Sequence, residues 1–215
     1  MRRAVFLDRD GTLIEEVAYL RDPARVRLLP GTGEALAHLR RKGFALVLVS
    51  NQSGIGRGLV RPEELTQVHR RLEECLLAFG VRLDGAFYCP HAPWEGCECR
   101  KPRPGLLLQA MHQMGVIAEG SFLVGNTDAD IAAGKAVGCT TVLLTLCPDL
   151  KHPVIGDPPA DYRAGSWEEV VAYISQVGRL RHRGDNKVET TTVWQGDGCR
   201  LPNAGPFIHK PSTFE

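Results

Sequence analysis

The chain has 215 residues, of which 43% are apolar and 24% are charged, and its formal net charge is +1. This length and composition suit one α/β core, and the balanced charge excludes the global basic field typical of nucleic-acid-binding proteins. Arg2 and Arg3 precede only a few apolar residues before Asp8, so they do not resemble a signal peptide, and no apolar run is long enough to span a membrane. We therefore expect a cytoplasmic monomer without a membrane partner.

Short apolar runs alternate with helical patterns along most of the chain. The predicted strands are residues 4–7, 44–49, 85–88, 122–124 and 140–144, and the predicted helices lie between residues 30 and 43, 62 and 80, 106 and 115, 131 and 138, and after 166. Residues 12–29 have no clean period and are expected to form a turn and a small flap. The alternation predicts a doubly wound parallel sheet of the α/β class, with a ligand crevice beyond the carboxyl ends of its strands.

We expect residues 1–178 to form this α/β domain. From residue 179 to residue 215 the pattern fails, because charged residues, glycines and prolines surround isolated apolar ones. Such a segment cannot bury a core of its own, so we expect a poorly packed C-terminal tail.

Two aspartates follow the first apolar run. Asp8 and Asp10 are spaced two apart and precede Gly11 and Thr12. Asp-x-Asp alone also suits an ordinary turn after a strand. The full sequence Asp-x-Asp-Gly-Thr after a buried strand is more specific, and it delivers two acid groups to the crevice.

Three further polar motifs follow later strands. Ser50 and Asn51 come after the second run, Lys101 follows the third, and a Gly-Asn-Thr-Asp-Ala-Asp segment that starts at Gly125 follows the fourth. Taken singly, they suit a strand-end turn, a solvated charge and a helix N-cap. Together with the first motif and in this order, they resemble the motifs of the haloacid-dehalogenase-like (HAD-like) phosphatases over about residues 3–144.

This resemblance implies a Rossmann-like HAD fold and a phosphomonoesterase mechanism. Asp8 would be the nucleophile that becomes an aspartyl phosphate, and Asp10 would protonate the leaving oxygen and then activate water. Ser50 and the backbone around Asn51 would hold phosphate oxygens, and Lys101 would offset their charge.

The resemblance also implies Mg²⁺, held by the Asp8 carboxylate, the Asp10 backbone carbonyl and the fourth motif. The family usually has Asp where this chain has Asn126. An amide oxygen ligates Mg²⁺ without supplying charge, so we expect a weakened metal affinity. Asp130 is a further candidate, as a ligand or as a group that orients metal-bound water, and Asp128 is an alternative to Asn126.

A cluster of cysteines and a histidine precedes Lys101. Cys89, His91, Cys97 and Cys99 lie within eleven residues, in a loop with prolines and a glycine. Four such ligands suit tetrahedral Zn²⁺, and the alternative is a set of incidental cysteines beside a surface histidine. The cluster resembles that of a zinc-containing HAD-like subgroup with D-glycero-D-manno-heptose bisphosphate phosphatases and histidinol phosphatases, in which the zinc is structural.

Many relatives carry an inserted cap domain, and neither gap that would hold one is long enough here, so the resemblance implies a capless, open site. Arg57, in a Gly-Arg-Gly turn, and Arg100 are cations near the crevice. Two arginines suit a second anionic group on the substrate, although Arg57 facing solvent is the alternative. A small phosphorylated sugar, D-glycero-D-manno-heptose 1,7-bisphosphate losing its 7-phosphate, fits this better than histidinol phosphate, the alternative substrate.

Two other functions stay open. A capless site also suits phosphorylated nucleic-acid ends, although the chain has no basic stripe with interleaved aromatic residues. Asn126 also suits a phosphosugar-binding protein that has lost turnover.

Overall fold

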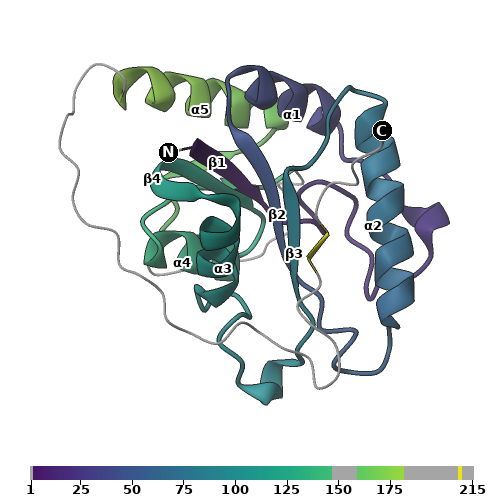
Figure 1. Ribbon diagram of the computed structural model, residues 1–215. Helices are drawn as coiled ribbons and strands as arrows, with labels where there is room; N and C mark the ends of the chain where they lie inside the picture. The colour runs from purple at the N-terminus through teal and green to yellow at the C-terminus, as the bar shows by residue number, and fades with distance from the viewer. Residues whose placement is uncertain (1, 147–158, 182–207, 210–215) are drawn as a thin grey trace.

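The computed structural model describes residues 2–146, 159–181 and 208–209, with side chains described as far as residue 178. These residues form a seven-stranded sheet with the order β6-β5-β4-β1-β2-β3-β7, whose centre is visible in Figure 1. Neighbouring strands are parallel except β7, which pairs antiparallel with β3. The strands are β1 (Arg2–Leu7), β2 (Ala45–Asn51), β3 (Gly85–Cys89), β4 (Val116–Gly125), β5 (Thr140–Leu144), β6 (Tyr162–Ala164) and β7 (Ile208–His209).

Helices cover both faces of the sheet, with α1, α2 and α5 on one face and α3 and α4 on the other (Figure 1). Each face has its own hydrophobic core, because successive side chains of a strand point to opposite sides. Val5 and Leu7 join one core, and Ala4 and Phe6 join the other. The predicted doubly wound parallel sheet is therefore confirmed. The helices are α1 (Thr32–Arg41), α2 (Pro62–Leu77), α3 (Gly105–Met114), α4 (Asp128–Ala136) and α5 (Trp167–Arg181), with 3-10 turns η1 (Pro23–Arg25) and η2 (Pro93–Glu95).

The register of the central strands sets the position of the crevice. Leu7 of β1 lies beside Leu48 of β2 and Val124 of β4. The residues that follow these three therefore leave the sheet at nearly the same level, at its carboxyl edge. Asp8 comes directly after β1, and Ser50 lies at the end of β2.

The loop after β1 is held from two sides. Gly11 has a φ of 72°, in the left-handed region that favours glycine, and a Cβ at this position would lie 2.2 Å from Nδ2 of Asn126 and would displace that side chain. Trp167, fully buried at the start of α5, donates its Nε1–H to the Thr12 carbonyl at 3.1 Å. The last helix of the domain thus contacts the loop of the first motif directly.

Some elements differ from the expectations. β4 begins at Val116 rather than at residue 122, because Gly120, with a φ of 71°, and a register shift against β1 let the strand continue through a polar stretch. The sequence pattern does not predict β6 or β7, which have three and two residues. Of residues 179–215, the structure describes β7 and the end of α5, which reaches Arg181. The expected poor packing of the remainder lies outside the described residues.

Within the described ranges, none of the helices combines the length and the apolar character that crossing a membrane requires.

Candidate active site

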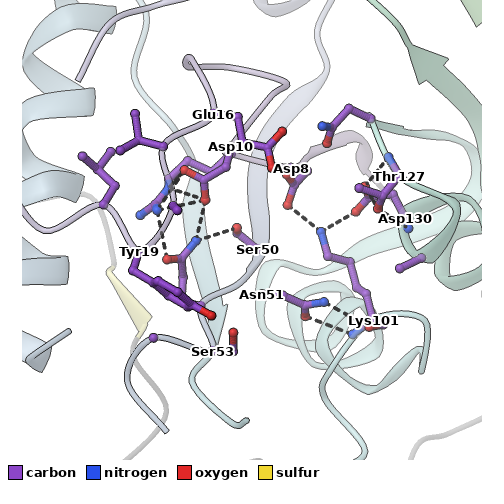
Figure 2. A pocket seen from close by; sticks show the side chains of 18 of the residues that line it. Asp8, Asp10, Glu16, Tyr19, Ser50, Asn51, Ser53, Lys101, Thr127 and Asp130 are labelled. Atoms are coloured by element: carbon purple, nitrogen blue, oxygen red, sulfur yellow. Dashed lines mark hydrogen bonds and ion pairs between the residues drawn. The ribbon is translucent and has the colours of Figure 1, made fainter. Parts of the chain in front are cut away.

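A cavity of about 380 Å³ lies at the carboxyl ends of β1, β2 and β4 (Figure 2). It is lined by the loop after β1, the loop after β2, the beginning of α4 and part of the expected flap, residues 16–20. The flap folds back through isolated bridges of Ile14 with Asp10 and Leu28. The predicted catalytic residues line the cavity together: Asp8, Asp10, Ser50 and Lys101.

Lys101 is a buried cation in this cavity, with 3% of its surface exposed. Its Nζ donates hydrogen bonds to Oδ1 of Asp8 at 2.7 Å, to Oδ1 of Asp130 at 2.5 Å and to the Val49 carbonyl at 2.7 Å (Figure 2). Burial by itself lowers the pKa of an ammonium group, but the carboxylates of Asp130 and Asp8 outweigh it and hold the pKa of Lys101 above its ordinary value. Lys101 therefore stays charged and can offset the charge of a phosphoryl group.

Asp8 is positioned by the sheet, since its backbone N–H donates to the Val124 carbonyl at 3.0 Å. Burial raises the pKa of Asp8 to about 6; Lys101 opposes this rise, and Asp130 and Asp10 add to it. Among the described residues, hydrogen bonds reach only Oδ1 of the Asp8 side chain. Oδ2 is therefore available to attack an electrophile or to ligate a cation.

Two residues outside the predicted set hold the Asp10 carboxylate. The Nε and Nη2 atoms of Arg9 donate to both oxygens of Asp10 at 2.9 to 3.2 Å. Nε2 of Gln52 donates to Oδ2 of Asp10 at 2.8 Å. The sequence signal for either residue is weak, because a lone arginine or glutamine in a loop usually faces solvent.

Ser50 and Asn51 have different surroundings. The Ser50 hydroxyl is buried and accepts a hydrogen bond from Nε2 of Gln52 at 3.1 Å. The Asn51 side chain donates to the Lys101 carbonyl and accepts from the Lys101 backbone N–H, both at 3.0 Å. Asn51 therefore fixes the backbone that carries Lys101, while its own backbone remains beside the cavity.

The fourth motif places Asn126 and Asp130 on the cavity. Oδ2 of Asp130 accepts from the backbone and the hydroxyl of Thr127 at 3.1 and 2.6 Å, and its Oδ1 accepts from Lys101. Asp130 is thus both the third residue of the capping box at the start of α4 and a partner of Lys101. Asp128 is exposed and does not line the cavity among the described residues, whereas the Asn126 side chain lies against the Gly11 loop.

The two predicted substrate arginines differ in their environment. Arg100 lines the cavity, and its buried Nη1 atom has no hydrogen-bond partner in the described part of the chain. The guanidinium carbon of Arg57 lies 4.6 Å from the ring centre of Trp94 and 6.0 Å from that of Tyr19. Tyr19 lines the cavity and Trp94 is exposed, so Arg57 lies at the rim, between the flap and the loop of the cysteine cluster.

Cys89, His91, Cys97 and Cys99 come together, and one ligand atom from each lies within 4.8 Å of the others. The Sγ atoms of Cys97 and either Cys89 or Cys99 are 3.6 Å apart, and those of Cys89 and Cys99 are 3.2 Å apart. Nδ1 of His91 lies 3.7 Å from Sγ of Cys89 and 3.3 Å from Sγ of Cys99. Tetrahedral zinc, about 2.3 Å from sulfur and about 2.0 Å from nitrogen, sets the sulfur–sulfur separation at about 3.8 Å and the sulfur–nitrogen separation at about 3.5 Å, within a few tenths of an ångström of most of these distances. The donor set and its spacing therefore fit zinc.

The thiol chemistry sets a condition on this fit. Cys99 is disulfide-bonded in the structure, and a disulfide sulfur cannot act as a thiolate ligand, so binding by all four residues requires reduced Cys99. Burial raises the pKa of the Cys89 thiol, so a cation is needed to hold this sulfur as a thiolate.

The cluster loop is joined to the loop after β2 by backbone hydrogen bonds. The N–H of Gly56 donates to the Pro90 carbonyl at 2.8 Å, and the N–H of Gln52 donates to the Cys89 carbonyl at 2.7 Å. A Cβ on Gly56 would lie 2.6 Å from the backbone N of Ala92. The cluster loop and the cavity loop are therefore packed too closely for any residue but glycine at this position.

Comparisons with known proteins identify the family of the chain. A family model described as HAD-hydrolase-like matches residues 98–146, which include Lys101 and the fourth motif. The crystal structure of D,D-heptose 1,7-bisphosphate phosphatase from B. bronchiseptica, complexed with magnesium and phosphate, superposes with a TM-score of 0.75 at 30% identity, over 82% of this chain and 99% of that one.

Curated relatives have the same name in several organisms. The D-glycero-β-D-manno-heptose-1,7-bisphosphate 7-phosphatase of Pasteurella multocida is 39% identical over 150 residues, which is 67% of this chain and 82% of the relative. That of Haemophilus ducreyi is 36% identical over 182 residues, which is 81% of this chain and 99% of the relative. The chain therefore belongs to the D-glycero-β-D-manno-heptose-1,7-bisphosphate 7-phosphatase family of HAD-like hydrolases.

Proposed function

We propose that this protein is a Mg²⁺-dependent phosphomonoesterase that removes the 7-phosphate of D-glycero-D-manno-heptose 1,7-bisphosphate through an aspartyl phosphate. The observation that carries the proposal is the buried contact of Lys101 with Asp8 and Asp130 at the carboxyl end of β1. It places a carboxylate with one available oxygen beside a fixed cation, in a cavity that also contains Asp10. The family membership of the chain supports the same activity.

The residues divide the reaction into two steps. In the first, Oδ2 of Asp8 forms a bond to phosphorus, the bond to the leaving oxygen breaks, and protonated Asp10 transfers its proton to that oxygen. In the second, Asp10 takes a proton from water, which attacks phosphorus and releases inorganic phosphate and Asp8. Lys101 and the Ser50 hydroxyl hold phosphoryl oxygens through both steps, and Lys101 offsets their charge.

The oxygen donors beside the cavity fit Mg²⁺, which prefers carboxylate and carbonyl ligands. The Asp8 carboxylate, the Asp10 backbone carbonyl and the Asn126 side chain would hold it, with Asp130 orienting a bound water or acting as a further ligand. When bound, Mg²⁺ supplies positive charge that neutralises the phosphate oxygens. Asn126 adds no charge of its own, so this chain binds Mg²⁺ more weakly than a relative with aspartate there.

Zinc has a structural role in this proposal. Cys89, His91, Cys97 and, once reduced, Cys99 would hold it, and it would fix a loop that ends at Arg100 and Lys101. The backbone hydrogen bonds of this loop to Gln52 and Gly56 carry the same constraint to the other side of the cavity.

Arg100 supports a substrate with two anionic groups. A buried guanidinium nitrogen without a partner in the described structure is costly to desolvate, and an anionic substrate group would satisfy it. Histidinol phosphate has a cationic far end, which a second arginine disfavours. Arg57 lies over the rings of Trp94 and Tyr19 at the rim of the cavity. There it assists Arg100 in binding the second anionic group of the substrate.

A phosphate-release assay with Mg²⁺ tests the proposal. The panel comprises the heptose bisphosphate, sugar monophosphates, histidinol phosphate and a 5′-phosphorylated oligonucleotide. We expect the highest kcat/KM for the heptose bisphosphate. Faster release from histidinol phosphate or the oligonucleotide assigns the enzyme to that substrate instead. Binding of the bisphosphate without release identifies a phosphosugar-binding protein.

We also propose that the protein acts as a monomer on a small phosphosugar in the cytoplasm. Light scattering of the purified chain at micromolar concentration tests the monomer, and cell fractionation tests the location.

A further inference from the structure

We propose that Gln52 is a positioning residue for the Asp10 carboxylate, and that it sets the place of the proton donor relative to the phosphate-binding hydroxyl of Ser50. This role rests on the proposed phosphomonoesterase function. It is distinct from substrate contact, because Gln52 acts through two other side chains.

The amide of Gln52 connects three groups. Its Nε2 donates to Oδ2 of Asp10 at 2.8 Å and to the Ser50 hydroxyl at 3.1 Å, and its Oε1 accepts from Nη2 of Arg9 at 2.9 Å. Both polar atoms of the Gln52 side chain are therefore engaged, in a residue that is only 8% exposed.

Arg9 fixes which way the amide faces. Its Nη2 donates to Asp10 and also to Oε1 of Gln52, so the three side chains close a ring of hydrogen bonds. If the amide were flipped, its oxygen would face the Asp10 carboxylate and its NH₂ group would face the guanidinium, and both contacts would be repulsive. The ring therefore specifies an amide with one orientation, which neither glutamate nor an apolar residue can supply.

Gln52 also restricts the orientation of the Asp10 carboxylate, which Arg9 alone does not fix. The guanidinium donates to both oxygens of Asp10 at similar distances, 2.9 to 3.2 Å, so it does not distinguish them. Gln52 contacts Oδ2 alone and connects that oxygen to Ser50. The separation between the proton-transfer group and the phosphate-binding group is thus set by one side chain.

The backbone of Gln52 is itself fixed. Its N–H donates to the Cys89 carbonyl at 2.7 Å, at the end of β3. A rigidly held positioning residue matters because proton transfer in the transition state requires close alignment, and a displacement of about 1 Å costs about a hundredfold in rate. Gln52 therefore contributes to proton transfer by holding Asp10, without itself giving or taking the proton.

The test compares two phosphate esters that differ in their need for a proton. An alkyl leaving group, as in the heptose bisphosphate, must be protonated, whereas p-nitrophenolate leaves without a proton. We expect Gln52→Met to lower kcat/KM for the sugar ester about ten- to a hundredfold, the range for a lost hydrogen bond to a charged group, and to lower that for p-nitrophenyl phosphate less than about threefold. Gln109→Met is the matched control, because Gln109 is a buried glutamine of α3 outside the cavity lining, and we expect it to change neither value.

A double-mutant cycle separates positioning from a general structural role. In an Asp10→Asn background, Gln52→Met should lower the remaining activity less than about twofold, because the group that it positions is already disabled. If Gln52→Met does not fold, as judged by thermal melting, Gln52→Glu keeps the shape and the acceptor facing Arg9 and removes the donor facing Asp10, and the same pattern is expected.

Equal losses on both esters, or full additivity with Asp10→Asn, overturn the positioning role while leaving the phosphatase activity in place. A wild-type chain that hydrolyses neither ester overturns the proposed function, and the positioning role with it.

Discussion

The cysteine cluster and the catalytic cavity share one segment, in which the cluster spans residues 89–99 and Lys101 of the cavity follows two residues later, yet they are held together differently. Lys101 forms ion pairs with Asp8 at 2.7 Å and with Asp130 at 2.5 Å, so opposite charges of the protein lie against one another there. The cluster brings three sulfurs and an imidazole within 4.8 Å, and nothing in this donor set offsets the charge of the thiolates that zinc binding requires. We infer that a metal at the cavity serves chemistry, whereas a metal at the cluster serves the fold.

The largest expected effect is at the cavity. Asp8→Asn should abolish turnover, because an amide cannot attack phosphorus, while its oxygen can still accept a hydrogen bond from Lys101. The melting temperature should therefore stay close to that of the wild type. Phosphate release and thermal melting check the two halves of this expectation. Retained turnover would remove Asp8 from the nucleophile role.

Zinc removal should have the second-largest effect, and it should act on stability. Cys97→Ser removes one ligand, and the loss of a crosslink worth about 3 kcal/mol lowers Tm by about 6 to 12 °C. Cys75→Ser is the matched control, since Cys75 is another partly buried cysteine but lies outside the cluster. Metal analysis should find about one zinc per wild-type chain. Protein that contains no zinc, without exposure to a chelator, contradicts this prediction.

Arg100→Ala should distinguish substrates. Loss of a charge-assisted contact of about 1.5 to 3 kcal/mol raises KM for the heptose bisphosphate about ten- to a hundredfold. The variant should barely alter hydrolysis of p-nitrophenyl phosphate, which has no second phosphate. Arg61→Ala, at the exposed N-cap position before α2, is the control. If both substrates are affected equally, Arg100 serves the reacting phosphate or the loop itself.

The smallest expected effect concerns Mg²⁺. Asn126→Asp adds an anionic ligand and should lower the Mg²⁺ concentration for half-maximal activity about three- to tenfold. Asp128→Asn should leave this concentration unchanged, because Asp128 is exposed and lies outside the described cavity lining. An unchanged requirement in Asn126→Asp means that Mg²⁺ is not bound by residue 126, and a raised requirement in Asp128→Asn assigns the ligand to Asp128.

The residues that the sequence predicts best are those that follow strands. Asp8, Ser50 and Asn126 each come directly after or at the end of an apolar run, and parallel strands bring such positions to one edge. Arg9 and Gln52 escape prediction for the opposite reason. Their burial depends on hydrogen bonds between residues that are 42 or 43 positions apart in the chain. A local sequence pattern does not predict such distant contacts.

The rim and the long strand could not be predicted for related reasons. Arg57 contacts the rings of Tyr19 and Trp94, which come from two separate loops, so its place depends on how those loops pack. β4 begins at Val116 because its first residues pair with β1. Polar residues separate them from the apolar run that starts at Phe122, so the apolar pattern does not predict this extension. Local sequence patterns therefore predict which helices and strands form, whereas tertiary packing determines where they begin and end.

The hydrogen bond from Trp167 to the Thr12 carbonyl spans 155 residues of sequence, and this separation has a consequence during synthesis. A ribosome that adds about 5 to 20 residues per second releases the β1 loop roughly 8 to 30 seconds before Trp167 is made. Throughout that interval the loop of Asp8 and Asp10 has no contact from α5. A nascent chain thus completes the contacts of its nucleophile loop only when nearly the whole domain has been made, so a prematurely terminated chain that lacks α5 should be released with a catalytic loop that lacks this support.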